Sequence, residues 1–145
     1  MVMKLALMPL SIQPFIERGQ DMAWFITTIG FFSVVEKDAD KSRGTLTIRS
    51  RVHSDLENLR DSYLPGMGEI LESTRSDYRF RAIASREAVS AAMAALVAGI
   101  EYSNFKDEVA SRHGYGRAGV YGHVWGQLYH LQSGRFEEPP DPRLI

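Results

Sequence analysis

The sequence predicts an α+β domain: an antiparallel sheet of about four strands, arranged as two hairpins, with helices packed on it. Short segments rich in aromatic and β-branched residues are joined by short loops, and strands joined in this way pair antiparallel. Segments with apolar residues at helical spacing follow each pair of strands. The expected order is therefore β-β-α-β-β-α-α-α, with one hydrophobic core between the sheet and the helices.

The first expected hairpin begins with the stretch WFITTIGFFSVVEK at residues 24–37. Aromatic and β-branched side chains occupy both parities of this stretch, which predicts one long central strand, covered on both faces and bulged at Gly30. A charged loop, DADKSRG, leads to residues 45–52, TLTIRSRV, where apolar and polar positions alternate. Arg49 and Arg51 share the polar side of this second strand.

A helix is expected in SDLENLRDSYL, because Ser54 and Glu57 form a capping box ahead of apolar residues at helical spacing. A proline and a glycine end this helix. The second hairpin follows, and its strands GEILEST and DYRFRAIA are joined by a turn around Arg75. Arg79 and Arg81 share one side of the later strand.

Three helices complete the expected order. Ser85 is expected to cap the first of them, and Asn104 is expected to cap the second, FKDEVASRH. The segment HGYGRAG separates the second helix from the last, whose apolar residues run from Val120 to Leu131.

Residues 22–132 are expected to form a single α+β domain. Residues 1–21 precede the first strongly patterned segment and are interpreted as an N-terminal extension. Residues 133–145, SGRFEEPPDPRLI, are rich in proline and acidic side chains, and we interpret them as a polar C-terminal tail.

Composition narrows the range of functions. The chain has 145 residues, 44% hydrophobic and 24% charged, and its net charge of −1 creates no overall field that favours nucleic acid or an anionic membrane. It has no cysteine, which excludes disulfides, thiolate metal sites and a cysteine nucleophile. The apolar start MVMKLALMPLSIQPF is too short to span a bilayer and no cleavage site follows it. We therefore expect a cytoplasmic protein that does not bind a membrane.

The segment HGYGRAG places Gly114, Gly116 and Gly119 at the spacing of a dinucleotide-binding turn. Such a turn requires a strand before it and a second parallel strand after the helix, and neither is expected here. We therefore interpret Gly114 as a left-handed residue that ends one helix, and the other two glycines as room for the chain to turn. No cofactor is expected.

No metal site is expected either. His123 and His130 lie seven residues apart on one face of the expected last helix, but no further ligand pattern accompanies them. Glu36, Asp38 and Asp40 cluster in the first hairpin loop without the glycine and terminal glutamate of a calcium-binding loop. We interpret these three carboxylates as a solvated loop.

Arginines on the expected strands form the strongest candidate site. Its anion-binding residues are Arg49, Arg51, Arg75, Arg79 and Arg81. If the two arginine-bearing strands pair, directly or across a neighbour, four guanidinium groups emerge on one face of the sheet, with the fifth at a loop tip. Guanidinium groups bind phosphate in bidentate fashion and stack on bases. The alternative is that these arginines form ion pairs with acidic neighbours on the wet face of the sheet.

Three classes of function stay open. The first is a small non-catalytic binding or interaction module that holds nucleic acid, a nucleotide or another anionic partner on the arginine-bearing face. The second is a small hydrolase or nuclease with His53, His113 or His123 as general acid or base. The third is a protein–protein adaptor that uses the sheet edge or the last helices, with a homodimer as one form. We favour the first because no catalytic motif is recognised; whether the chain is an enzyme stays open.

Several stretches within residues 22–132 resemble a family of small, uncharacterised bacterial proteins. The stretches are WFITTIGFFSVVEK, LTIRSRVHSDLENLR, DYRFRAIAS, YSNFKDEV and HVWGQLY. The resemblance implies a stand-alone bacterial domain. It implies no particular chemistry and transfers no catalytic residue to this chain.

Overall fold

The structure, a computed structural model, describes residues 22–134. The chain divides into two compact units, Met1–Ile100 and Glu101–Ile145. The first unit contains a β-sheet with helices, and the second contains two helices. The expected N-terminal extension, and all but the first two residues of the expected C-terminal tail, lie outside the described residues.

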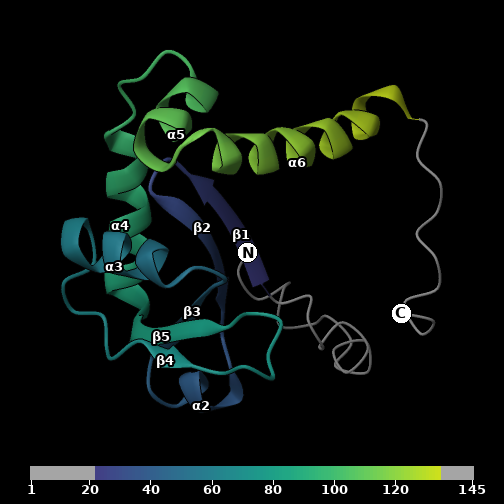
Figure 1. The fold of residues 1–145 in the computed structure, drawn as a ribbon. Coiled ribbons are helices and arrows are strands. Elements are labelled where there is room, and N and C mark those ends of the chain that lie inside the picture. The colour runs from purple at the N-terminus through teal and green to yellow at the C-terminus, as the bar shows by residue number, and fades with distance from the viewer. Residues whose placement is uncertain (1–21, 135–145) are drawn as a thin grey trace, which may run out of the picture. The chain divides into compact units, whose positions relative to one another are not determined.

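A five-stranded antiparallel sheet forms the centre of the first unit, with the strand order β1-β2-β3-β5-β4 (Figure 1). Its strands are β1 (Met22–Thr27), β2 (Gly30–Val35), β3 (Thr45–Ser50), β4 (Leu71–Glu72) and β5 (Phe80–Ser85). Every neighbouring pair is antiparallel. The predicted α+β class, with helices on an antiparallel sheet, is confirmed, and the sheet has one strand more than the four expected.

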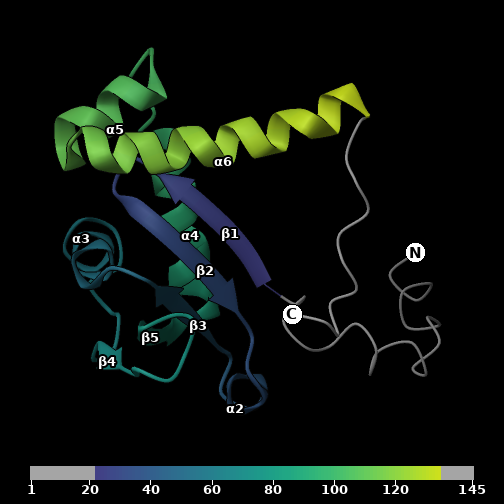
Figure 2. The same ribbon diagram turned by 45° about the vertical axis from the view of Figure 1, so that its right-hand side comes forward.

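Two helices cover one face of this sheet, and Figure 2 shows α4 lying behind the strands. They are α3 (His53–Ser62) and α4 (Arg86–Ala98), while α2 (Asp38–Lys41) is a single turn between β2 and β3. The strands contribute alternate apolar residues to the core, and the two helices contribute their apolar stripes. Fully or almost fully buried members of this core are Phe32, Ile48, Leu56, Leu59, Ala82, Val89 and Ala92.

The prediction of one long strand over residues 24–37 is wrong. β1 and β2 are separate strands that form a tight hairpin, in which Thr27 lies opposite Gly30. The Thr27 hydroxyl holds the turn: it donates to the Gly30 carbonyl (2.8 Å) and accepts from the Ile29 amide (3.2 Å). Gly30 is not a bulge, and a Cβ at this position would lie 2.5 Å from Cγ of the buried Asp55. β1 lies at the edge of the sheet. The hairpin contacts α3 at Gly30, where any larger residue would clash with Asp55.

Side-chain caps begin two of the helices as predicted. The Ser85 hydroxyl accepts a hydrogen bond from the amide three residues further on, and Asn104 caps the next helix in the same way. The capping box predicted at Ser54 is wrong, because α3 begins one residue earlier, at His53, and its extended cap residue is Val52. Ser54 consequently lies within the first turn, where its hydroxyl is not placed to accept from the third amide of the helix.

The second unit consists of α5 (Phe105–His113) and α6 (Tyr115–Ser133). Gly114 joins them with φ 92° and ψ 167°, which is a positive-φ conformation, as predicted, but not the left-handed helical one. Gly116 and Gly119 lie inside α6, so the prediction that they give the chain room to turn is wrong. The segment is helix, glycine, helix, and it lacks the strand that a dinucleotide-binding turn requires.

Candidate anion-binding site

Arg49 and Arg81 lie directly opposite each other on the neighbouring strands β3 and β5. Residues paired in this register project from the same face of a sheet, so the two side chains emerge next to each other. Their chain neighbours Ile48 and Ala82 point the other way, into the core. We call the face that bears the two arginines the arginine face. Its central row takes one residue from each strand, in sheet order: Trp24, Ser33, Arg49, Arg81 and Leu71.

Tyr78 gathers three guanidinium groups on the arginine face. It belongs to the loop between β4 and β5, and it is only 2% exposed. The guanidinium carbons of Arg49 and Arg51 lie 4.5 and 4.9 Å from the centroid of its ring, within cation–π range. The Arg81 guanidinium donates a long hydrogen bond, 3.5 Å, to the backbone carbonyl of Tyr78. The structure thus brings Arg49, Arg51 and Arg81 together around one residue.

These three arginines form no ion pair with any carboxylate of residues 22–134. Arg49 donates instead to the Ser33 hydroxyl at 2.8 Å. The Nε–H groups of Arg49 and Arg81 are buried and have no hydrogen-bond partner within the part of the chain that the structure describes. A buried donor without a partner costs about 1–3 kcal/mol, and like charges directly opposite each other destabilise a sheet. The arrangement therefore lowers stability.

The other two arginines of the predicted site lie elsewhere. Arg79 precedes β5, forms a 2.7 Å ion pair with Glu72, and places its guanidinium carbon 5.5 Å from the ring centroid of Phe80. Arg75 lies in the turn between β4 and β5, where its side chain is exposed and has no polar partner among the described residues. Of the five predicted arginines, three therefore lie together: Arg49, Arg51 and Arg81. Arg79 is separated from them by its ion pair with Glu72.

Trp24 is a residue of this face that the sequence analysis did not identify. It is 57% exposed, and its indole Nε1–H donates to the Tyr78 hydroxyl at 3.0 Å. Its ring packs edge-on against Phe31, with the centroids 5.8 Å apart and the planes at 83°. The two contacts fix the orientation of an exposed aromatic ring beside the arginines. A turn predicted at Thr27–Gly30 would have paired Trp24 with Ser33 and so placed it on this face.

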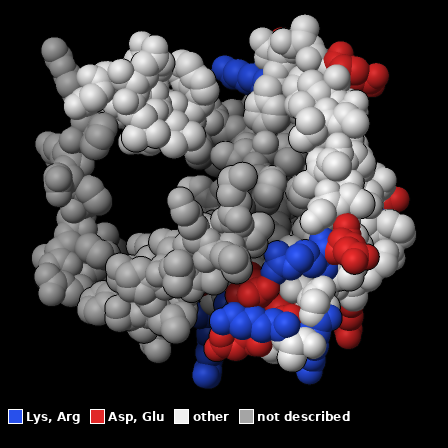
Figure 3. Space-filling model, turned by 180° about the vertical axis from the view of Figure 1, so that it is seen from behind, with Lys and Arg blue, Asp and Glu red and all other residues white. Residues whose placement is uncertain are grey.

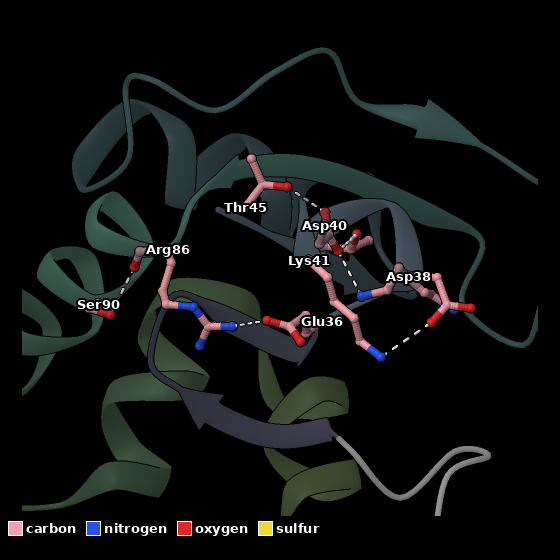
Figure 4. A network of polar contacts seen from close by, with 9 residues as sticks. Glu36, Asp38, Asp40, Lys41, Thr45, Arg86 and Ser90 are labelled. Atoms are coloured by element: carbon pink, nitrogen blue, oxygen red, sulfur yellow. Dashed lines mark hydrogen bonds and ion pairs between the residues drawn. The ribbon is translucent and has the colours of Figure 1, made fainter. Parts of the chain in front are cut away.

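Several other charged side chains of the first unit form ion pairs. On the face shown in Figure 3, Lys and Arg side chains lie beside Asp and Glu side chains and form no patch of a single sign. Figure 4 shows two such contacts: Arg86 of α4 with Glu36, and Lys41 with Asp38 at 3.4 Å. The contrast sets the arginine face apart, because its guanidinium groups lack acidic partners among the described residues.

Asp40 is a buried acid whose carboxylate has three hydrogen-bond donors around it (Figure 4). It accepts from the Thr45 and Thr47 hydroxyls at 2.5 and 2.9 Å and from the Lys37 amide at 2.8 Å. Burial raises the pKa of Asp40, but these hydrogen bonds and the charge of Arg43 outweigh burial, so the pKa lies below the ordinary 3.8. Asp40 therefore ties α2 to the start of β3, and its oxygens are occupied by protein donors.

His53, the histidine of the first unit, does not belong to the arginine face. His53 pairs with Glu57 at 2.8 Å and packs edge-on against Phe80, a residue of the opposite sheet face. His113 ends α5, and His123 and His130 are carried by α6. Within residues 22–134, no group of three or more His, Cys, Asp or Glu side chains is placed to hold a metal ion.

Apolar side chains of α6 are exposed over much of its length. The exposed large members are Tyr115, Val120, Trp125, Leu128, Tyr129 and Leu131. Trp125 and Tyr129 stack on each other with ring centroids 5.6 Å apart. Despite this apolar surface, none of the helices in residues 22–134 is both long and apolar enough to span a bilayer. Exposed apolar patches are typical of interaction surfaces.

Comparison of this chain with protein-family models, with curated proteins and with solved structures found no match. The resemblance of residues 22–132 to a bacterial family therefore stays a prediction. The function has to be argued from the geometry of the arginine face.

Proposed function

We propose that this protein is a non-catalytic binding module that holds a phosphate-bearing ligand, a nucleotide or nucleic acid, on the arginine face. The observation that carries the proposal is the group of three arginines around Tyr78 without a carboxylate partner among the described residues. Arginines on a wet sheet face usually find acidic neighbours, as Arg79 does with Glu72. Arg49, Arg51 and Arg81 leave their charge available to a ligand.

A phosphate group is the anion that best fits this arrangement. The planar guanidinium fork donates two parallel hydrogen bonds to phosphate oxygens, and phosphate esters offer several oxygens and more than one negative charge. Three gathered arginines can share such a group, whereas a single carboxylate would neutralise only one of them. Because the whole chain carries a net charge of only −1, the attraction has to come from this local group.

The surroundings of the three arginines favour binding over catalysis. The side chains and carbonyls that contact them are Met22, Ser33 and Tyr78. The Ser33 hydroxyl is buried and its contacts are to Arg49 and the Met22 sulfur, with no base beside it among these contacts. General acid–base chemistry needs a titratable group within hydrogen-bond reach of the reacting atoms. The titratable side chain among these contacts, Tyr78, is almost fully buried, and its hydroxyl accepts from the Trp24 indole.

Isothermal titration calorimetry with inorganic triphosphate tests this proposal. The intact protein is expected to bind triphosphate saturably, and the affinity should fall steeply as salt concentration rises. Arg49→Gln and Arg81→Gln should each weaken binding at least five-fold, because each removes a charge-assisted bidentate donor. Arg79→Gln is the matched control: it removes the same charge from a residue that already pairs with Glu72, and the affinity should stay unchanged. Equal affinities in all four proteins would reject the proposal.

A further inference from the structure

We infer that the ligand of the arginine face is a single-stranded nucleic acid, one of whose bases stacks on Trp24 while its phosphates contact Arg49 and Arg81. The inference rests on the proposed function, because it specifies the ligand of the same site. What it adds is a recognition element, an aromatic platform in the same cross-strand row as the arginines.

Trp24 has the properties of a stacking platform. Its ring is 57% exposed although its only polar atom is already satisfied by the Tyr78 hydroxyl. The edge-on contact with Phe31 and the hydrogen bond to Tyr78 hold the indole before a ligand arrives. A pre-oriented aromatic ring loses little conformational entropy on binding, and stacking of a base on it contributes about 1–3 kcal/mol.

The spacing of the row suits a ligand longer than one nucleotide. Trp24, Ser33, Arg49 and Arg81 occupy four successive strands of the sheet. Because neighbouring strands lie about 4.8 Å apart, the row from Trp24 to Arg81 is about 14 Å long. A chain of consecutive nucleotides can place a base at one end of this row and phosphates at the other. A free phosphate or a triphosphate would contact the arginines and leave Trp24 unused.

A single strand fits the row better than a duplex. In a duplex, both faces of every internal base are covered by stacking neighbours, so an aromatic side chain lying on the face of a sheet cannot reach them. An unpaired strand can turn a base onto an exposed ring, and the stacking is tolerant of sequence. Arg49 and Arg81 are carried by the strands β3 and β5. They do not lie on a helix of the kind that enters the major groove of a duplex.

Fluorescence anisotropy with a fluorescein-labelled 12-residue oligothymidylate tests the inference on the full chain. We expect the logarithm of the binding constant to fall with the logarithm of salt concentration with a slope of about −1.4, since Arg49 and Arg81 each contribute about −0.7 for a single strand. Trp24→Leu should weaken oligonucleotide binding about ten-fold or more through loss of stacking. It should weaken triphosphate binding much less, because triphosphate contacts the arginines and not the indole ring. Arg81→Gln should weaken both, and Arg79→Gln neither.

A second measurement leaves Trp24 in place and so does not depend on the folding of a Trp24 variant. In the Trp125→Phe protein, Trp24 is the only tryptophan, and saturating oligothymidylate should quench its fluorescence. If triphosphate binds through the arginines but the oligonucleotide neither quenches Trp24 nor loses affinity in Trp24→Leu, the inference fails while the proposed function stands. A duplex of equal length or a phosphoserine peptide that binds as tightly as the single strand would also overturn the inference. Loss of triphosphate binding altogether would reject the proposed function itself.

Discussion

At the scale of single residues, the buried charged groups of the first unit differ in their hydrogen bonding. Asp40 has protein donors on both carboxylate oxygens, and this fixes α2 against the start of β3. Arg49 and Arg81 have buried Nε–H groups that lack partners among residues 22–134. Fully hydrogen-bonded buried charge is typical of a structural role, whereas unmet donors that lower stability are typical of sites that await a ligand. The distinction leads to separate predictions for the two kinds of residue.

Asp40→Asn is expected to destabilise the protein by about 1–3 kcal/mol at pH 7, because the amide replaces an acceptor with a donor that faces other donors. The folded-state pKa of Asp40 lies below 3.8, so its contribution is complete above that pH and is lost as the pH falls through the folded-state pKa. Urea unfolding at several pH values should therefore show the largest difference between wild type and variant at neutral pH. The difference should shrink below about pH 3.8.

Asp38→Asn provides the control for this prediction. Asp38 lies in the same short helix, but its side chain is fully exposed and contacts only Lys41, at 3.4 Å. An exposed pair of this kind contributes little, so the unfolding free energy should change by less than about 0.5 kcal/mol at every pH. An equally large loss in both variants would show that net charge, and not the hydrogen bonds of Asp40, sets the effect.

Simple alternation was enough to predict part of the site at this scale. Arg49 and Arg81 were expected on one sheet face from their parity, and the register of β3 with β5 places them directly opposite. The separation of Arg79 from that pair could not be predicted, because it depends on where Glu72 of β4 lies. Which side chains meet across two strands depends on the pairing register of those strands, and the pattern of residues within one strand does not determine that register.

At the scale of elements, the prediction of secondary structure succeeded at helix caps and failed at a tight turn. The segment TTIG carries no asparagine or proline, and its turn is closed by the hydroxyl of Thr27, so an apolar run of β-formers was interpreted as one strand. This error misplaced Trp24. The hairpin reverses the chain, so Trp24 lies on the sheet face opposite Phe32. Helix starts with a strong cap, at Ser85 and Asn104, were predicted correctly.

Ser85→Ala is expected to lower the unfolding free energy by about 1 kcal/mol, through loss of the hydrogen bond that caps α4. Ser54→Ala is the matched control, since Ser54 is exposed in the first turn of α3 and caps no amide. It should change the stability by no more than a few tenths of a kcal/mol. Urea unfolding of the two variants checks both values. A larger effect at position 54 than at position 85 would contradict the assignment of the two helix starts.

At the scale of the whole molecule, the sheet and its core belong to one of the two compact units. Every buried member of the core, from Ile29 to Ala92, lies within Met1–Ile100. The three arginines, Tyr78 and Trp24 belong to the same unit. The composition of the chain does not change abruptly near residue 100, so no linker signal marked this boundary in the sequence. The core and the candidate site therefore share one folding unit.

The fragment Met1–Ile100 is expected to fold by itself and to bind triphosphate with an affinity within about two-fold of the full chain. The described members of the sheet core all lie inside this fragment, and a unit of this size with a single well-packed core usually unfolds in one cooperative transition. A dispersed amide spectrum, a single sigmoidal urea transition and a calorimetric titration with inorganic triphosphate measure the three properties. A collapsed spectrum would show that the core needs the second unit. A folded fragment that no longer binds triphosphate would show that residues after Ile100 belong to the ligand site.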